Sequence, residues 1–206
     1  MIANKDCLYV SPEDYLAGEK VSPIKHEYRN GSIYAMVGAK NPHVMIAINL
    51  ATLLRNHLRG TGRFPFASDT KVRIETSNSF YYPDIAVSCD EGDTNSLEDF
   101  IQFPVLIIEV LSPSTEAFDR GEKFADYRAL DSLQEYVLIA QDRISVECYR
   151  RNAQGRWELY SYTEGQEIEL ASVNFSCAFA LRAYSIAAFY EDVPGISYWS
   201  GEQDLC

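Results

Sequence analysis

The sequence lacks most features that mark a secreted, zinc-binding or membrane-spanning protein. Its five cysteines form no Cys-x-x-Cys pair, and its three histidines show neither His-x-His nor His-Glu-x-x-His spacing. These absences argue against a disulfide framework and against a zinc site built from cysteine or histidine. No apolar run approaches the roughly 18 to 20 residues that a bilayer requires, and no export signal is visible at the N-terminus. We therefore expect a cytoplasmic protein without a membrane segment.

Basic residues are also scarce. The chain has 18 Lys and Arg against 30 Asp and Glu, a net charge of -12, which argues against coating nucleic acid by bulk electrostatic attraction. The imbalance is uneven, because residues 1–60 carry more basic than acidic side chains while residues 61–206 are strongly acidic. Any basic surface must therefore draw mainly on the first third. Arg55, Arg59, Lys71 and Arg73 are candidates for phosphate contacts, although such side chains are more often only solvated surface charges.

Apolar residues are abundant. They make up 47% of the chain, and aromatic residues 13%, which is enough to fill one hydrophobic core. No repeat, low-complexity tract or linker divides the 206 residues. We predict a single domain over residues 1–206, with its core in about residues 10–190 and an N-terminal helix and hairpin in residues 11–36.

Local signals predict the order of helices and strands. Ser11-Pro12 opens a short helix that Gly18 ends, and Asn30-Gly31 predicts a hairpin turn between two strands. A longer helix begins at Asn41-Pro42, with His43 in its first turn. Further strands are expected at residues 68–74, 82–87, 104–111, 135–140, 144–151 and 157–162, and further helices at 115–130 and 183–190. This order predicts an α+β fold with a central mixed, mainly antiparallel sheet flanked by helices.

Glu109 is the residue that core packing explains least. It lies within Pro104–Leu111, the most apolar run of the chain, which is typical of a strand covered on both faces. Burying an ionised carboxylate there costs several kcal/mol unless a cation or hydrogen bonds compensate. Glu109 therefore belongs either to a functional site or to a buried structural ion pair.

Asp84 is the second unusual acid, since it follows Pro83 at the start of an apolar strand. Proline in a strand indicates an edge, a bulge or a strand start, and such irregularities often direct a side chain into a site. If the two strands are neighbours, Asp84 and Glu109 face each other and offer the oxygen ligands that Mg²⁺ or Mn²⁺ prefers. Otherwise Asp84 is an ordinary acid at a strand entrance.

The helix after Glu109 carries a possible cationic partner. Asp119, Lys123 and Tyr127 are spaced four residues apart and so share one helical face. From that face the lysine could reach the carboxylates. In the alternative reading, Asp119 and Lys123 form an ordinary exposed helical ion pair.

Several of these motifs together resemble one bacterial family. They are Glu27-Tyr28-Arg29-Asn30-Gly31, His43 near a helix start, Pro83-Asp84, Glu109, Leu111-Ser112-Pro113-Ser114-Thr115, Asp119, Lys123, Tyr127 and Glu135-Tyr136. In this arrangement the chain resembles the Uma-two family, which is described as putative restriction endonucleases and is part of the PD-(D/E)xK nuclease superfamily. The resemblance extends over roughly residues 10 to 190 and implies a restriction-endonuclease-like fold.

The resemblance also implies roles for individual residues. Asp84 corresponds to the acid of the PD element and Glu109 to the acid of the (D/E)xK element, which together would hold Mg²⁺ or Mn²⁺. Leu111 stands where the motif has lysine, so Lys123 becomes the displaced motif lysine. Asp119 and Tyr127 would support Lys123. His43 and Glu27 would assist as additional metal or proton-transfer groups.

The implied activity is metal-assisted hydrolysis of phosphodiester bonds in DNA by a homodimer. Two other readings stay open. The missing strand lysine and the acidic composition also suit an inactive nuclease fold that serves as a binding or assembly module. Paired carboxylates also occur in glycoside hydrolases, but nothing in the spacing indicates sugar subsites, and a helix lysine would have no purpose there.

Overall fold

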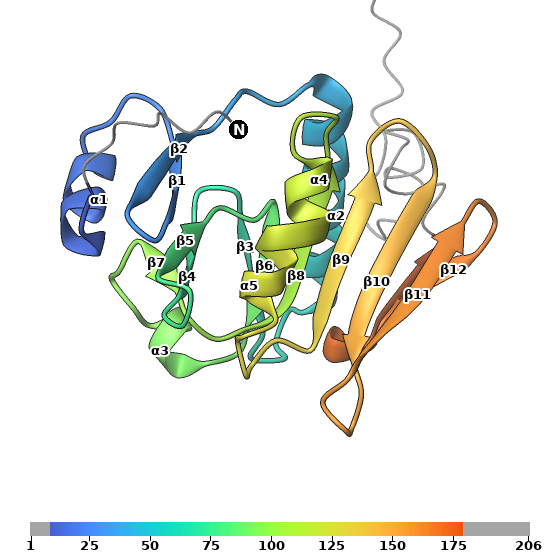
Figure 1. Cartoon of the computed structure of the whole chain (residues 1–206). Helices are drawn as coiled ribbons and strands as arrows, with labels where there is room; N and C mark the ends of the chain where they lie inside the picture. Colours follow the sequence, from blue (N-terminus) through green and yellow to red (C-terminus); the bar gives the residue numbers. More distant parts are fainter. Residues whose placement is uncertain (1–8, 179–206) are drawn as a thin grey trace, which may run out of the picture.

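The computed structural model describes residues 9–178, whose strands form two large sheets and one small ribbon (Figure 1). The five-stranded sheet has the order β2 (Ser32–Ala35), β1 (His26–Arg29), β5 (Ser79–Tyr81), β4 (Lys71–Ile74) and β7 (Phe100–Ile101). The six-stranded sheet has the order β11 (Trp157–Thr163), β10 (Ser145–Arg151), β9 (Glu135–Ala140), β8 (Pro104–Leu111), β6 (Ile85–Ser88) and β3 (Phe64–Ala67). The ribbon pairs β12 (Glu167–Leu170) with β13 (Phe175–Ala178).

The pairing confirms a mixed, mainly antiparallel α+β fold. The β8–β9 and β4–β7 pairs are parallel, and the other strand pairs that the structure describes are antiparallel. The sequence led us to expect one central sheet, however, whereas the strands divide between two. No helix within residues 9–178 is long and apolar enough to cross a membrane.

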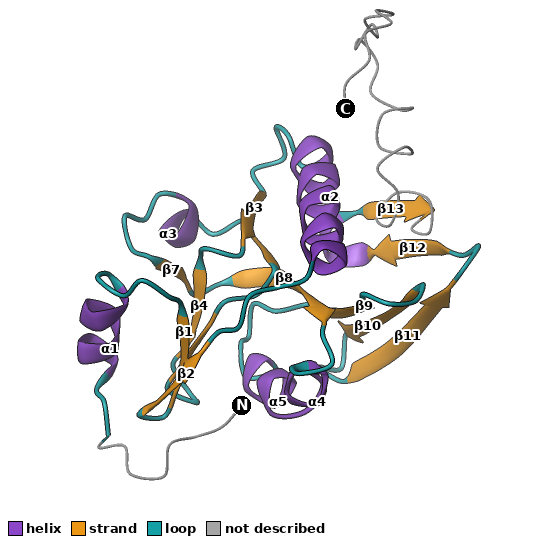
Figure 2. Ribbon diagram, turned by 90° about the horizontal axis from the view of Figure 1, so that it is seen from above, coloured by secondary structure: helices purple, strands orange, loops and turns teal. Residues whose placement is uncertain are grey.

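Helices cover the six-stranded sheet from both sides, as Figure 2 shows from above. The long helix α2 (Asn41–His57) packs on one face, and a helical segment made of α4 (Glu116–Phe118), a π-helical turn (Asp119–Lys123) and α5 (Phe124–Tyr127) packs on the other. The shorter helices are α1 (Pro12–Glu19), α3 (Glu91–Thr94) and the 3₁₀ turn Ala171–Val173. The N-terminal helix α1 lies beside the five-stranded sheet.

Strand β8 is the centre of the core because both of its faces are covered. Its alternate side chains Leu106, Ile108 and Val110 pack in the cluster that contains the buried face of α2. Ile107 and Leu111 point the other way, into a cluster with residues of α5 and β9. Glu109 lies between these two along the strand. Its carboxylate is therefore directed toward the helical segment after β8 rather than toward α2.

Most predicted elements are present, with boundaries shifted by a few residues. Asn30 and Gly31 both have positive φ, 44° and 88°, so the Asn-Gly hairpin is confirmed. The strand expected at residues 68–74 begins only at Lys71, and the one expected at 82–87 begins at Ile85. Strands β3, β5, β7, β12 and β13 and helix α3 were not predicted. The helix expected at residues 183–190 lies outside the described residues.

Glu135, at the start of β9, attaches the β12–β13 ribbon to the main sheet. It is fully buried, and its carboxylate accepts hydrogen bonds from Arg150 Nε at 2.7 Å and from the Ser172 backbone N–H at 2.8 Å and hydroxyl at 2.6 Å. Ser172 lies in the 3₁₀ turn that joins the two ribbon strands. One carboxylate thus links β9, β10 and the turn.

We predict that Glu135→Ala lowers the free energy of unfolding by about 3–5 kcal/mol, because it leaves Arg150 and the Ser172 N–H without their buried acceptor. Urea denaturation measures the change. The control is Glu158→Ala, which removes an exposed carboxylate on β11 and should change stability by less than about 0.5 kcal/mol. Equal effects of the two substitutions would show that the ribbon does not depend on Glu135.

Candidate active site

The candidate site lies where the chain passes from one sheet to the other. Strand β5 of the five-stranded sheet ends at Tyr81, and β6 of the six-stranded sheet begins at Ile85. Tyr82, Pro83 and Asp84 form the link. Because proline cannot donate a backbone hydrogen bond, Pro83 interrupts strand pairing and leaves Asp84 at the junction of the sheets.

Asp84 is held by contacts from two other elements. Its Oδ2 accepts a hydrogen bond from the Val110 N–H at 2.7 Å, and its Oδ1 lies 2.8 Å from His43 Nε2. A carboxylate only accepts hydrogen bonds, so Nε2 of His43 carries the proton. The first contact fixes Asp84 against β8, one residue beyond Glu109, and the second joins it to the first turn of α2. Asp84 directly precedes β6, which pairs with the strand β8 that carries Glu109, so the condition set by the sequence analysis is met.

Lys123 forms the centre of a buried ionic cluster. Its Nζ lies 2.9 Å from Glu109 Oε1, 2.9 Å from Glu27 Oε1 and 3.6 Å from Asp119 Oδ1. All four side chains are at most 9% exposed. The cluster joins β1 of the five-stranded sheet, β8 of the six-stranded sheet and the helical segment that follows β8. It is a buried ion pair network in which one lysine faces three carboxylates.

The backbone of the helical segment differs from the regular helix expected at residues 115–130. Residues Asp119–Lys123 form a π-helical turn between α4 and α5, and Gly121, a poor helix former, lies within it. Such turns are rare and occur frequently at functional sites. This one includes both Asp119 and Lys123, so the irregular backbone coincides with the residues that face Glu109.

Tyrosines complete the walls of the cluster. The Tyr127 hydroxyl lies 3.5 Å from Glu109 Oε1, and Lys123 Nζ stands 5.5 Å from the ring centre of Tyr81. The backbone N–H of Tyr82 donates to Glu27 Oε1 at 3.3 Å. The cation is thus surrounded by carboxylates and aromatic rings, which favours its charged form.

Burial and the nearest opposite charge shift the pKa of each of these groups in opposite directions. Burial raises the pKa of Glu109 well above its usual range, against the lowering effect of Lys123, and Asp119, Asp84 and Glu27 add to the rise. Burial likewise raises the pKa of Asp119. Burial alone would lower the pKa of Lys123, but Glu109 and Glu27 raise it well above its usual value. The site therefore contains more carboxylates than Lys123 alone can compensate.

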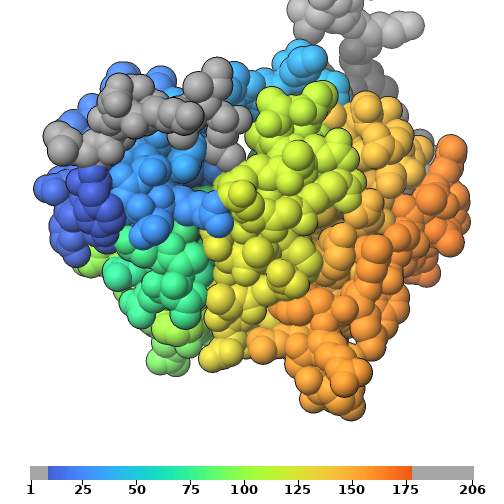
Figure 3. Space-filling view, viewed as in Figure 1, coloured from blue at the N-terminus to red at the C-terminus, as the bar shows by residue number. Residues whose placement is uncertain are grey.

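Access to the site is asymmetric. Glu27, Glu109, Asp119 and Lys123 are nearly enclosed, whereas His43 and Asp84 keep 16% and 14% of their side-chain surface exposed. Figure 3 shows the segment around residues 112–127 covering the middle of the visible face, against the residues of β1 and β2. A ligand would therefore approach from the side of His43 and Asp84, at the first turn of α2.

The donor set has the chemistry of a hard divalent cation. Residues 9–178 contain no group of three or more His, Cys, Asp or Glu side chains placed to hold a metal ion. Asp84 and Glu109 nevertheless supply two carboxylates, and Mg²⁺ is commonly bound by one or two carboxylates, water and substrate phosphate rather than by an all-protein cage. The excess of buried carboxylates around Lys123 also favours a cation. These side chains therefore have the donor chemistry that a hard divalent cation prefers.

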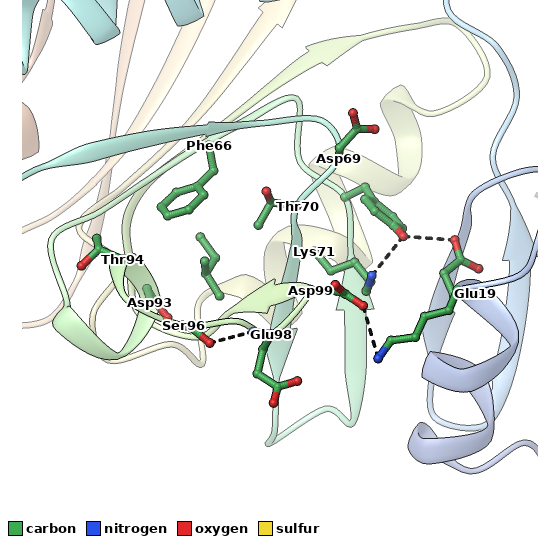
Figure 4. A pocket seen from close by; sticks show the side chains of 13 residues that line it. Glu19, Phe66, Asp69, Thr70, Lys71, Asp93, Thr94, Ser96, Glu98 and Asp99 are labelled. Carbon is green, nitrogen blue, oxygen red and sulfur yellow. Dashed lines mark hydrogen bonds and ion pairs between the residues drawn. The ribbon is translucent and has the colours of Figure 1, made fainter.

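A separate cavity of about 440 Å³ lies between α1, β4 and the segment before β7 (Figure 4). Its wall includes Glu19, Asp69, Glu98 and Asp99, together with Lys71, whose Nζ donates to the Tyr82 hydroxyl at 3.3 Å. Asp84, Glu109 and Lys123 do not line it. Lys71, a candidate phosphate contact from the sequence, is buried here against Tyr82.

Comparison with known families decides the classification. A family model described as "Uma2: Putative restriction endonuclease" matches residues 12–182. The chain belongs to the Uma2 family. The match includes every residue of the cluster and confirms the resemblance inferred from the sequence motifs.

Relatives and solved structures agree with this classification. Two proteins of Synechocystis sp., each named only "Uncharacterized protein", are 41% identical over 82% of this chain and 88% of the relative, and 35% identical over 77% and 90%. The crystal structure of a putative nuclease belonging to DUF820 from Anabaena variabilis has a TM-score of 0.69 and 15% identity. It matches 87% of this chain and 99% of that one. At this identity the similarity establishes the fold, which is nuclease-like.

The structure brings all seven residues singled out in the sequence into one region. Glu27, Glu109, Asp119, Lys123 and Tyr127 share the ionic cluster, and His43 and Asp84 lie beside it. Sequence reasoning placed Glu27 among the minor contributors, but it is as close to Lys123 as Glu109 is. It also overlooked the Tyr81 ring and the Val110 N–H. Neither carries a sequence signal, because both depend on how the two sheets meet.

We predict that Lys123→Met lowers the free energy of unfolding by about 3–5 kcal/mol, because it leaves three buried carboxylates without their cation. Chemical denaturation at neutral pH in the presence of a chelator measures the change. Adding Glu109→Gln to this variant should recover part of the loss, since one uncompensated charge is removed. A Lys123→Met protein as stable as the wild type would contradict the charge assignment.

Proposed function

We propose that this protein is a metal-dependent nuclease that hydrolyses phosphodiester bonds in DNA, with Asp84 and Glu109 as metal ligands and Lys123 as the displaced motif lysine. One observation carries the proposal. The helix lysine reaches to within 2.9 Å of the carboxylate on β8, while the second acid is hydrogen bonded to the next residue of that strand. The Uma2 membership and the nuclease-like fold support the same activity.

Each residue has a role that follows from its contacts. A bound Mg²⁺ or Mn²⁺ supplies Lewis-acid polarisation of the phosphate. Asp84 and Glu109 would hold the ion, and Lys123 would stabilise negative charge on the phosphate oxygens or orient the attacking water. Asp119 and Glu27 keep Lys123 charged and in place. His43 fixes the orientation of Asp84 through Nε2, and its buried Nδ1, which has no hydrogen-bond partner within residues 9–178, is the ring atom left for proton transfer.

A homodimer is part of the proposal. A two-fold pair of subunits can place one site on each strand of a duplex, which is a common solution for enzymes that cut both strands. Sedimentation equilibrium measures the subunit number directly. A strictly monomeric protein at high concentration would remove this part and leave the hydrolytic site unaffected.

A second function is favoured by the closed state of the cluster. Lys123 already pairs with all three nearby carboxylates, so the same geometry suits a rigid scaffold in which an inactive nuclease fold serves as a binding or assembly module. This alternative predicts no turnover with any metal and no divalent-ion site that depends on Glu109. These two results would distinguish the scaffold from a hydrolytic enzyme.

The test is cleavage of plasmid or oligonucleotide DNA with Mg²⁺ or Mn²⁺. We expect Asp84→Asn and Glu109→Gln each to lower the rate by about 100-fold or more, because each removes charge at the point where the transition state needs it. Calorimetry should show Mn²⁺ binding that Glu109→Gln abolishes.

The matched control is Asp99→Asn, an acid in the wall of the separate cavity, which should leave both cleavage and Mn²⁺ binding unchanged. Wild-type protein that neither cuts DNA nor binds Mn²⁺ would favour the scaffold. Variants at Asp84 and Glu109 that cut as fast as the wild type would show that the roles are assigned wrongly.

A further inference from the structure

One long segment of this acidic protein contains no acidic residue. The chain has 30 Asp and Glu in 206 residues, yet none of them falls within residues 28–68. This segment includes the end of β1, all of β2, α2 and β3. It also carries five Lys and Arg residues: Arg29, Lys40, Arg55, Arg59 and Arg63. Charge is therefore segregated along the chain, and the basic part includes the helix that brings His43 to the site.

Four of these five basic side chains have no carboxylate partner among the residues that the structure describes. Arg29 pairs with Asp126, but Lys40, Arg55, Arg59 and Arg63 form no ion pair with any residue in 9–178. Lys40, Arg55 and Arg59 are exposed. No carboxylate within residues 9–178 therefore neutralises these exposed charges.

Basic side chains elsewhere in the described chain behave differently. Most of them form ion pairs with carboxylates: Lys20, Lys25, Arg73, Arg120, Lys123, Arg143, Arg150 and Arg151. In a protein with so many acids, pairing is the common outcome. Within residues 9–178, the cations on and around α2 thus lack the carboxylate partners that most other basic side chains have. Their own segment contains no acid that could pair with them.

The position of this surface relates it to the site. The α2 helix has 17 residues and is about 26 Å long, and it lies on the outside of the six-stranded sheet (Figure 2). Lys40 is the N-cap residue of α2, three positions before His43, and its side chain is exposed. Arg55 lies in its last turn, and Arg59 follows its end. Cations thus lie at both ends of α2, with the exposed apolar side chains of Val44 and Ile48 between them, and the helix covers most of one turn of a DNA duplex.

We propose that the outer surface of α2 and its flanking residues, from Lys40 to Arg63, binds the phosphate backbone of duplex DNA and directs it to the Asp84–Glu109 site. Exposed cations on a segment that contains no Asp or Glu match a polyanion such as a phosphate backbone. The assignment of the site as the destination rests on the proposed nuclease function. Binding of DNA to α2 does not.

The test measures binding of a labelled duplex of about 30 base pairs, roughly three helical turns, by fluorescence anisotropy in a chelator that prevents cleavage. We expect the double variant Arg55→Ala/Arg59→Ala to bind at least about 10-fold more weakly at low salt. The slope of log affinity against log salt should become about 1.8 smaller, because two phosphate contacts are lost. Both side chains are exposed, and circular dichroism checks that the fold is retained.

The matched control is Arg128→Ala/Arg156→Ala. Both arginines are exposed and lack a carboxylate partner within residues 9–178, but they lie outside the acid-free segment. The control removes the same charge and should leave affinity within about 2-fold of the wild type, because it removes no phosphate contact. Unchanged binding by the α2 variant, or equal weakening by both variants, would overturn the proposal. Loss of self-association in place of DNA binding would identify α2 as a protein interface and overturn it too.

A small substrate separates this inference from the proposed function. Hydrolysis of bis(p-nitrophenyl) phosphate with Mn²⁺ requires the site but no extended DNA surface, so the α2 variant should retain the wild-type rate while cleaving DNA more slowly. If wild-type protein hydrolyses neither substrate but the α2 variant still binds DNA more weakly, the nuclease function fails and the binding surface stands. If hydrolysis is normal but the α2 variant binds DNA as the wild type does, the nuclease function stands and the binding surface fails.

Discussion

The pairing of the Lys123 ammonium with Glu109 and Glu27 is the interaction on which the rest of the site depends. It joins a residue from each of the two sheets to the helical segment that follows β8. Without the cation, two carboxylates would face each other in the interior, which costs several kcal/mol. Lys123 therefore both holds the sheets together at their junction and concentrates carboxylates beside Asp84. The same ion pairs of Lys123 thus stabilise the fold and form the candidate site.

The fold provides this junction through two interruptions of regular backbone. Pro83 lies in the link between β5 of one sheet and β6 of the other, and Asp84 after it is hydrogen bonded to β8. The π-helical turn Asp119–Lys123 interrupts the helix after β8 at the residues that face Glu109. Glu135 has a comparable position at the other end of the sheet, but there the carboxylate meets an arginine and backbone N–H groups and is fully compensated. Glu135, whose charge is matched by its hydrogen-bond donors, is a structural acid. Glu109, which shares one lysine with two other carboxylates, is a functional candidate.

Much of this could be predicted from the sequence, because the strongest signals are local. The apolar run of β8 and the Asn30-Gly31 turn each have one simple physical explanation, and Glu109 stands out as the one charged residue in that run. The division into two sheets could not be predicted, since the short strands β3, β5 and β7 are specified by their partners and not by their own residues. The π-helical turn was missed for a similar reason. A spacing of four residues indicates a shared helical face, but it does not distinguish an α-helix from a π-helical turn.

The most direct test of the account is a crystal structure of the protein grown with Mn²⁺, in which anomalous scattering locates the ion. The account predicts one strong peak with carboxylate oxygens of Asp84 and Glu109 at about 2.0–2.2 Å, close to the ideal for small hard cations, and with Lys123 still beside Glu109. Strong peaks at the carboxylates of the separate cavity, with none between Asp84 and Glu109, would contradict it. In that case the buried cluster would be a structural ion pair network alone.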